Sequence, residues 1–186
     1  MTPNPTAAPP RERILHTAHD LFYRDGIRAT GIDRVIAESG VAKVTFYRQF
    51  PSKDDLILAF LDFRHERWMA WFRQALARHG DGVAAIAPAL AEWFRGDDYR
   101  GCAFLNSVGE LASALPAVLD ATRRHKQDMT AAVTRLMKPA PGRARVARAL
   151  ALAIDGAIVQ AQYLASPDAA VEALARVAKS LSKELG

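Results

Sequence analysis

The sequence has few of the residues that build metal centres and disulfide frameworks. A single cysteine, Cys102, stands among 186 residues, and the five histidines do not cluster at ligand spacings. One cysteine excludes an internal disulfide, and without clustered histidines zinc and iron–sulfur chemistry have no ligand set. We therefore expect no metal and no cofactor.

Long hydrophobic runs and strand-like alternation are also missing. No run approaches the roughly 18 to 20 apolar residues that a membrane span needs, and the opening "MTPNPTAAPPRER" lacks the apolar core of a signal peptide. We expect a cytoplasmic protein with no membrane partner. Valine, isoleucine, threonine and tyrosine do not alternate with period two over a useful length, which predicts an all-α fold.

Acidic residues are too few to balance the basic ones. Lysine and arginine number 25 against 20 aspartates and glutamates, giving a net charge of +5 that favours an anionic partner. Residues 121–150 carry eight of these cations against one acid, Asp128, but no aromatic or glycine-rich segment accompanies them. We interpret that cluster as solvated helix faces.

The stretch "VAKVTFYRQFPSK", residues 41–53, has a different composition. It combines three cations with hydroxyl and aromatic side chains and contains no acid. A helix that only packed into a core would not need its cations, and a helix that only faced water would not need its aromatic residues. The surface it forms must serve both a core and a polar partner.

Helical periodicity organises the chain before this stretch. Prolines 3, 5, 9 and 10 predict a disordered leader over residues 1–10. Apolar residues at helical spacing from Arg11 predict a first helix that ends at Gly26, a left-handed cap. Thr30 and Asp33 are placed to form a capping box for a short second helix, which Gly40 ends.

The stretch 41–53 then predicts a short third helix closed by Pro51, and Ser52 with Asp55 caps a long fourth helix. We assign residues 11–56 to an N-terminal three-helix domain and 57–186 to a C-terminal helical domain for ligand binding and dimerisation. The further helices are expected at about 82–95, 103–114, 116–137, 143–165 and 167–185.

Two short helices joined by a glycine turn, the second basic and amphipathic, form a helix-turn-helix that inserts its second helix into the DNA major groove. Val41, Phe46 and Phe50 would hold that helix against the others. Such a triplet of helices can also arise by chance in an all-α protein. The candidate DNA-binding residues are Thr30, Lys43, Val44, Thr45, Tyr47, Arg48 and Lys53.

The segment "GIRATGIDRVIAESGVAKVTFYRQFPSKDDLI" closely resembles the DNA-binding segment of TetR-family transcriptional regulators. The resemblance implies DNA contacts at the positions of Thr30, Lys43, Thr45, Tyr47, Arg48 and Lys53. Val44 and Gln49 depart from the family pattern, which has a small residue and a histidine or aromatic residue there. The matching residues are Ala29, Thr30, Ile36, Ala37, Gly40, Val41, Lys43, Thr45, Phe46, Tyr47, Phe50, Ser52, Lys53, Asp54 and Leu56.

A homodimer is expected, because one recognition helix gains too few contacts for a selective site. Two late helices carry stripes of small and branched residues, which either form a dimer interface or pack into their own domain. The family resemblance implies that these helices form a four-helix interface. The candidate interface residues are Ala147, Leu150, Ala151, Ile154, Ala157, Ile158, Ala161, Val171, Leu174, Ala178 and Leu181.

A site for a small, mostly apolar effector is expected in the middle of the chain. Aromatic residues share one face of the fourth helix, and the stretch "GCAFLNSVGEL" places polar residues four apart. Bulky aromatic residues at helical spacing can equally be plain core. The candidate effector-binding residues are His65, Trp68, Phe72, Trp93, Cys102, Phe104, Asn106 and Glu110.

The sequence therefore predicts a ligand-responsive repressor that binds a palindromic DNA operator as a homodimer. An enzyme would make Cys102 a nucleophile with His65 or His125 as base, but no local catalytic signature accompanies them. An all-α protein-interaction module is the other alternative. Salt-dependent binding to DNA distinguishes it from a regulator.

Overall fold

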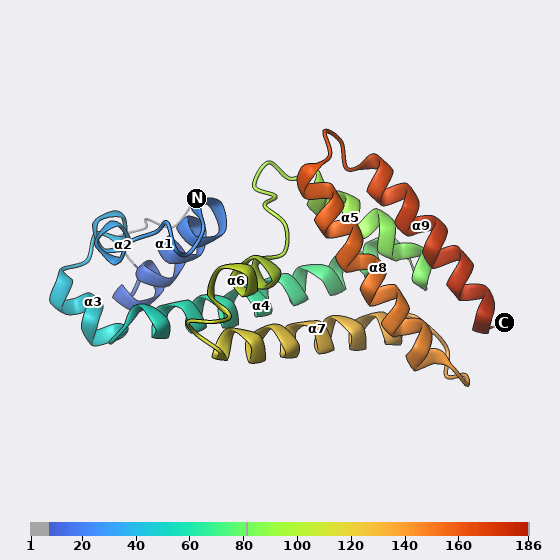
Figure 1. The fold of residues 1–186 in the computed structure, drawn as a ribbon, viewed down its shortest axis with the longest axis horizontal. Coiled ribbons are helices and arrows are strands. Elements are labelled where there is room, and N and C mark those ends of the chain that lie inside the picture. Colours follow the sequence, from blue (N-terminus) through green and yellow to red (C-terminus); the bar gives the residue numbers. More distant parts are fainter. Residues whose placement is uncertain (1–7, 81, 186) are drawn as a thin grey trace. The chain divides into compact units, whose positions relative to one another are not determined.

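The computed structural model describes residues 8–80 and 82–185, and within these ranges the regular elements are all helices. The leader predicted over residues 1–10 lies for its first seven residues outside this range, and Pro10 already begins the first helix. The all-α prediction is confirmed. The α-helices, labelled in Figure 1, are α1 (Pro10–Asp25), α2 (Ile32–Ser39), α3 (Lys43–Gln49), α4 (Lys53–Arg78), α5 (Ile86–Phe94), α6 (Ala103–Leu111), α7 (Ala117–Arg135), α8 (Arg143–Tyr163) and α9 (Asp168–Ser182).

The chain forms two compact units. The first contains residues up to His65 together with Ala103–Thr122, so that α1, α2, α3, the first half of α4, α6 and the start of α7 belong to it. Its buried side chains come from every one of these helices, with the rings of Phe22 on α1 and Phe60 on α4 meeting edge to face at 5.5 Å. The largest buried side chains of this unit are Ile14, Leu21, Ile27, Phe46, Phe50, Leu56, Ile57, Phe60, Leu61 and Phe104.

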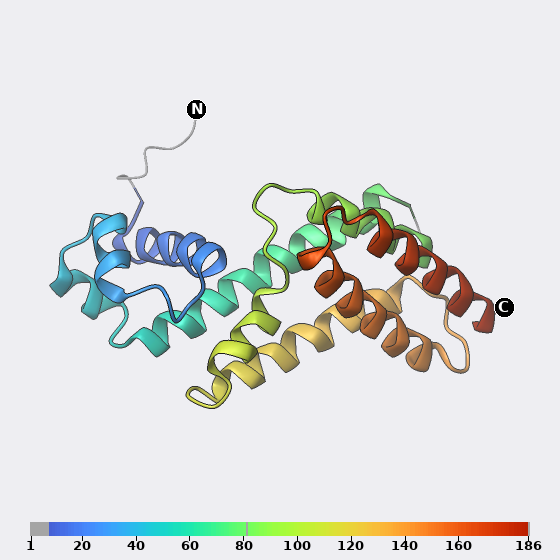
Figure 2. The ribbon, with the colours of Figure 1, turned by 45° about the horizontal axis from the view of Figure 1, so that its top comes forward.

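The second unit contains Glu66–Cys102 and Arg123–Gly186. In it α8 and α9 form a helical hairpin, and α9 also packs against α5 (Figure 2). The hairpin is closed by buried apolar residues of both helices, among them Ile154 and Leu174. The predicted division at residues 56 and 57 falls inside α4 and stays a prediction.

Most predicted helix ends are confirmed, because the responsible signals are local. Ser52 and Asp55 form the predicted capping box: the Asp55 backbone N–H donates to the Ser52 hydroxyl, and the Ser52 backbone N–H donates to the Asp55 carboxylate. Gly40 ends α2 in the left-handed region, with φ of 63° and ψ of 32°. A side chain there would be strained, so the turn into α3 requires this glycine.

Two predicted caps are wrong. Gly26 follows α1 with φ of 90° but ψ of 154°, which is outside the left-handed helical region. Thr30 does not cap α2, since Gly31 occupies that position without a side-chain hydrogen bond. The Thr30 hydroxyl instead donates to the Gly26 carbonyl oxygen, 2.8 Å away, and the residue is fully buried. Because its hydroxyl bonds to an earlier residue and not to the first turn of α2, Thr30 stabilises the loop before α2.

Candidate DNA-binding surface

The turn between α2 and α3 is held from α1. The Arg13 side chain donates to the carbonyl oxygens of Ser39 and Gly40, where the C-terminal end of α2 leaves carbonyls without helical partners. Arg13 therefore fixes the direction in which the chain enters α3. Arg13 and Ser39 are 26 positions apart, so the sequence carries no local signal for this contact.

The inner face of α3 is anchored in the first unit as predicted. Val41, Phe46 and Phe50 are buried, and the Arg11 guanidinium lies over the Phe50 ring at 4.8 Å from its centre. These contacts leave the helix no freedom to rotate about its axis without opening the core. Its other faces are thereby presented to solvent in a fixed orientation.

The outer face of α3 is cationic and partly apolar. Lys43, Val44, Tyr47 and Arg48 are exposed, and Thr45 is half-buried. The Lys43 ammonium lies 3.2 Å from an Asp33 carboxylate oxygen, but both side chains are highly exposed. An ion pair of this kind contributes little, so Lys43 can exchange Asp33 for another anion.

Two other predicted DNA-binding residues, Thr30 and Lys53, use their side chains in hydrogen bonds within the first unit. The Lys53 ammonium donates to the carbonyl oxygens of Ile27 and Thr30 at 2.8 and 2.7 Å. Burial lowers the pKa of Lys53, while the charge of Glu110 acts in the opposite direction. Lys53 and Thr30 thus brace the loop between α1 and α2 from inside.

Glu110 on α6 reaches the same loop. One of its carboxylate oxygens accepts a hydrogen bond from the Arg28 backbone N–H at 2.8 Å, and a Cβ at Gly26 would come within 3.4 Å of the carboxylate. Glu110 is one of the predicted effector-binding residues. In the structure this carboxylate fixes the loop that precedes α2.

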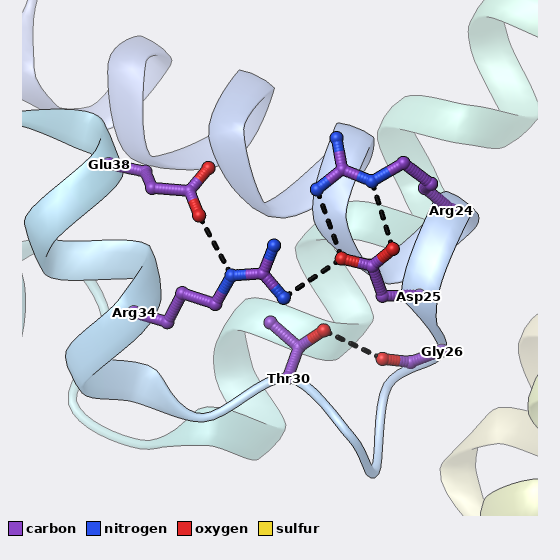
Figure 3. A network of polar contacts seen from close by, with 6 residues as sticks. All are labelled: Arg24, Asp25, Gly26, Thr30, Arg34 and Glu38. Atoms are coloured by element: carbon purple, nitrogen blue, oxygen red, sulfur yellow. Dashed lines mark hydrogen bonds and ion pairs between the residues drawn. The ribbon is translucent and has the colours of Figure 1, made fainter.

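An exposed ion-pair network links the end of α1 to α2 (Figure 3). Asp25 accepts from the Arg24 guanidinium at 2.9 and 3.0 Å and pairs with Arg34 at 2.9 Å, while Arg34 also donates to Glu38. The hydrogen bonds from Arg24, with Arg34 adding to them, hold the pKa of Asp25 below its usual value. The network was not foreseen, because it depends on how the two helices cross.

The predicted effector residues are divided between the two units. His65, Phe104, Asn106 and Glu110 belong to the first unit, and the other four belong to the second. In the second unit a cluster of rings surrounds Trp68, with ring centres of Phe72, His125 and Trp93 at 4.7, 5.0 and 5.6 Å. Trp71 joins the cluster at 6.0 Å.

Trp68 is 6% exposed, and its indole N–H has no hydrogen-bond partner among the described residues. A buried donor without an acceptor is costly and unusual in a folded protein. Cys102 is also buried, and the Lys126 ammonium lies 3.4 Å from its sulfur and 2.6 Å from Asp155. The polar neighbour of this thiol is therefore a cation that is itself paired with an acid.

The predicted dimer stripe is largely inside one chain. Eight of its eleven residues, all those named from Ala147 to Ile158 together with Leu174 and Ala178, are buried in the second unit, whereas Ala161, Val171 and Leu181 are half-buried. The sequence left open whether the stripe serves a partner or its own domain, and α8 and α9 use it to pack on their own unit. Side chains already removed from water offer little surface to a second subunit.

A different face of these helices carries exposed apolar residues. Leu152, Val159 and Tyr163 follow one another along α8 at helical spacing, and Leu152 is 75% exposed. Val177 on α9 is also exposed. Exposed apolar residues aligned on one helix face are the kind of surface that a protein partner can cover.

The described residues provide neither a metal cluster nor a membrane span. Between residues 8 and 185, Asp81 apart, no three histidine, cysteine, aspartate or glutamate side chains are grouped closely enough to hold a metal ion. No helix in the same ranges is long and apolar enough to cross a membrane.

Known proteins share both the local motif and the whole fold. Residues 14–60 match the family model described as bacterial regulatory proteins, tetR family. The crystal structure of a TetR-family transcriptional regulator from Streptomyces coelicolor is similar with 33% identity and a TM-score of 0.81, over 95% of both chains. A TetR transcriptional regulator from Chloroflexus aurantiacus is similar with 25% identity and a TM-score of 0.78, over 94% of both.

Curated relatives match over a shorter region. The uncharacterized regulator YxaF of Bacillus subtilis is 35% identical over 77 residues, which are 41% of this chain and 40% of YxaF. The transcriptional activator FasR of Mycolicibacterium smegmatis is 31% identical over 84 residues, or 45% of this chain and 38% of FasR. The chain thus aligns with less than half the length of either relative.

The fold and the recognition-helix surface define a helix-turn-helix protein with a helical C-terminal region. The chain belongs to the TetR family, since the similarity to the Streptomyces coelicolor regulator extends over nearly all of both chains. The relatives are transcriptional regulators rather than enzymes, which argues against a nucleophilic role for Cys102.

Proposed function

We propose that this protein is a ligand-responsive transcriptional repressor that binds a palindromic DNA operator as a homodimer. The observation that carries the proposal is α3, whose buried aromatic face fixes it to the first unit while its acid-free outer face is exposed. A helix presented in this way fits the major groove, which is wide enough to admit it.

Each exposed residue of α3 has a chemical counterpart on DNA. Lys43 and Arg48 suit phosphates or guanine edges, and the Tyr47 hydroxyl suits a phosphate oxygen. Thr45 and Val44 suit base edges and methyl groups. Thr30 and Lys53 support the same surface indirectly, because their side chains brace the loop before α2.

The homodimer would form through the exposed face of α8 and α9. Leu152, Val159, Tyr163 and Val177 supply the apolar surface, in place of the stripe that the chain buries itself. A two-fold axis there would present two α3 helices to half-sites one helical turn of DNA apart, about 34–36 Å, or a multiple of that distance. The operator would then be palindromic.

The effector would be a small, mostly apolar molecule bound beside Trp68. The orphan indole N–H of Trp68 and its ring neighbours Phe72, Trp93 and His125 support this proposal, since a ligand oxygen could accept the hydrogen bond. Cys102, which belongs to the same unit as Trp68, remains a candidate for a further contact. His65, Phe104 and Asn106 belong to the first unit and stay predictions, and Glu110 moves to the role of a brace.

Release from DNA would follow from preferential binding of the effector to a conformation that does not fit the operator. Such a coupling is bounded by the difference in affinity for the two conformations, typically about 1–3 kcal/mol. FasR is named an activator, and the transcription assay below distinguishes activation from repression. Repression here rests on the simplest action of an operator-bound dimer, which is to block other proteins from the same DNA.

One experiment tests the proposal in three stages. Selection from random duplexes with the purified chain should recover a symmetric sequence, whose affinity falls steeply with salt. Transcription in vitro from a promoter that overlaps this sequence should decrease when the protein is added. A panel of aromatic ketones and phenols should contain compounds that quench tryptophan fluorescence and restore transcription, and Trp68→Phe should weaken both effects more than Trp71→Phe.

Failure at each stage has a separate meaning. If selection recovers no sequence and binding to genomic fragments is independent of salt, the chain is an interaction module and not a DNA-binding regulator. If transcription rises instead of falling, the chain activates. If quenching compounds leave DNA binding unchanged, the tryptophan cluster is core and not an effector site.

A further inference from the structure

Val44 is a highly exposed apolar residue on the recognition helix α3. It is 72% exposed at the second position of α3, between Lys43 and Thr45. Single exposed apolar residues are common on protein surfaces, so exposure alone does not indicate a function. Val44 is of interest because it stands on the helix that is proposed to contact DNA.

Val44 shares a helix face with two other exposed residues. Residues three and four apart are neighbours on a helix surface, which groups Val44 with Tyr47 and Arg48. Tyr47 is 41% exposed, and Phe46 and Phe50 lie on the buried face. The isopropyl group therefore forms part of the surface that is proposed to enter the major groove.

A valine is an unfavourable choice for this position in the free protein. β-branched side chains lose rotamer freedom in helices and are poorer helix formers than alanine or lysine. In a seven-residue helix this cost is not offset by burial, because Val44 remains in water. A bound state in which an apolar partner covers the isopropyl group would offset this cost.

The major groove offers one apolar group at base edges, the C5-methyl group of thymine, and 5-methylcytosine carries the same group. We propose that Val44 is a specificity-determining residue that reads a C5-methyl group in each operator half-site. The inference rests on the proposed DNA-binding function and specifies which base the recognition helix selects. Arg48 and Tyr47, one turn further along the same face, would contact the DNA next to the base that Val44 reads.

If Val44 contacts a thymine methyl group, the effect on affinity of removing that methyl group should depend on whether the valine side chain is present. Replacing the contacted thymine by deoxyuridine removes the methyl group and leaves base pairing intact. The parent protein should then bind about threefold to fivefold more weakly per half-site, the effect expected for one methyl group withdrawn from an apolar contact. Val44→Ala should bind the thymine operator more weakly and should respond much less to the same replacement.

The test is a double-mutant cycle on the selected operator. Each thymine of the half-sites is replaced in turn by deoxyuridine, symmetrically in both, and affinities are measured for the parent, Val44→Ala and Val44→Thr. The threonine variant preserves the branched shape while replacing one methyl group by a hydroxyl, and it controls for changes in the helix itself. In a further arm, the contacted thymine–adenine pair becomes cytosine–guanine with and without a 5-methyl group on the cytosine.

The expected result is one thymine position whose methyl dependence is present in the parent and reduced in Val44→Ala, with 5-methylcytosine binding better than cytosine there. The proposal is overturned if every deoxyuridine operator binds the parent as the thymine operator does, or if the loss is equal in Val44→Ala. A parent that selects an operator but lacks this coupling disproves only the role of Val44. A parent that selects no operator disproves the DNA-binding function, and this inference with it.

Discussion

The Glu110 carboxylate on α6 accepts a hydrogen bond from the backbone N–H of Arg28, 82 residues earlier in the chain, at 2.8 Å. Arg28 lies in the loop that leads from α1 into α2, and both residues belong to the first unit. The loop is braced on its other side by Lys53. The entry to the helix-turn-helix is thus fixed by two oppositely charged side chains from different helices.

Replacing Glu110 tests this brace. Glu110→Ala should lower the free energy of unfolding by roughly 1–2 kcal/mol, because a charge-assisted hydrogen bond is lost. Glu110→Gln should cost less, since its amide oxygen can still accept. Hydrogen exchange of the Arg28 amide should accelerate in Glu110→Ala and remain slow in the control Glu66→Ala, which alters an exposed residue. Unchanged exchange at Arg28 would show that the hydrogen bond does not hold the loop.

Lys53 should matter for stability as well as for charge. Lys53→Met preserves most of the aliphatic stem but leaves the carbonyl oxygens of Ile27 and Thr30 without their donor, at a cost of about 1–3 kcal/mol. Denaturant unfolding should show a lower midpoint with the same slope. Lys138→Met, at an exposed position, should leave the midpoint nearly unchanged, and an equal effect of the two substitutions would contradict the brace.

The exposed apolar face of α8 should hold the dimer. Leu152→Arg places a charge in the proposed interface and should give a folded monomer in sedimentation at micromolar concentration, with operator affinity lost. Gln74→Arg adds the same charge at an exposed position of α4 and should leave the dimer intact. A Leu152→Arg protein that sediments as the parent does would place the interface elsewhere.

Asp25 should contribute to stability in a pH-dependent way. Its pKa in the folded protein is held below the ordinary value, first by the hydrogen bonds from Arg24. A carboxyl group with a lowered pKa stabilises the folded state above its unfolded pKa, about 3.9, and loses this contribution as the pH falls through the folded value. Asp25→Asn should therefore be less stable than the parent at pH 7, and the difference should begin to shrink below about pH 4 and vanish below the folded pKa. A difference that stays constant with pH would assign the effect to packing.

The elements that the sequence predicted correctly depend on neighbours a few residues apart. The Ser52–Asp55 capping box and the Gly40 turn are each specified within four residues, and the burial of Phe46 and Phe50 follows from helical periodicity. Periodicity identified the apolar stripes of α8 and α9 equally well. It could not tell which stripe the chain buries itself, because two apolar faces of one helix give the same kind of pattern.

Two of three contacts that the sequence missed join distant residues. Thr30 was expected to cap α2 by accepting a backbone hydrogen bond, yet its hydroxyl donates to the Gly26 carbonyl oxygen four residues earlier. Glu110 looked like a ligand-binding group because a polar residue on a half-buried helix needs a partner, and that partner proved to be the Arg28 amide. Arg13 gave no signal at all, since its role depends on the packing of α1 against the end of α2.

The salt dependence of operator affinity tests the central claim, that the outer face of α3 contacts DNA, most directly. Lys43→Ala should bind the selected operator more weakly, and its plot of log affinity against log salt should be shallower by about one unit for each lysine that touches a phosphate. Tyr47→Ala should also bind more weakly. Folded Lys43→Ala and Tyr47→Ala proteins with the affinity and salt slope of the parent would contradict the account.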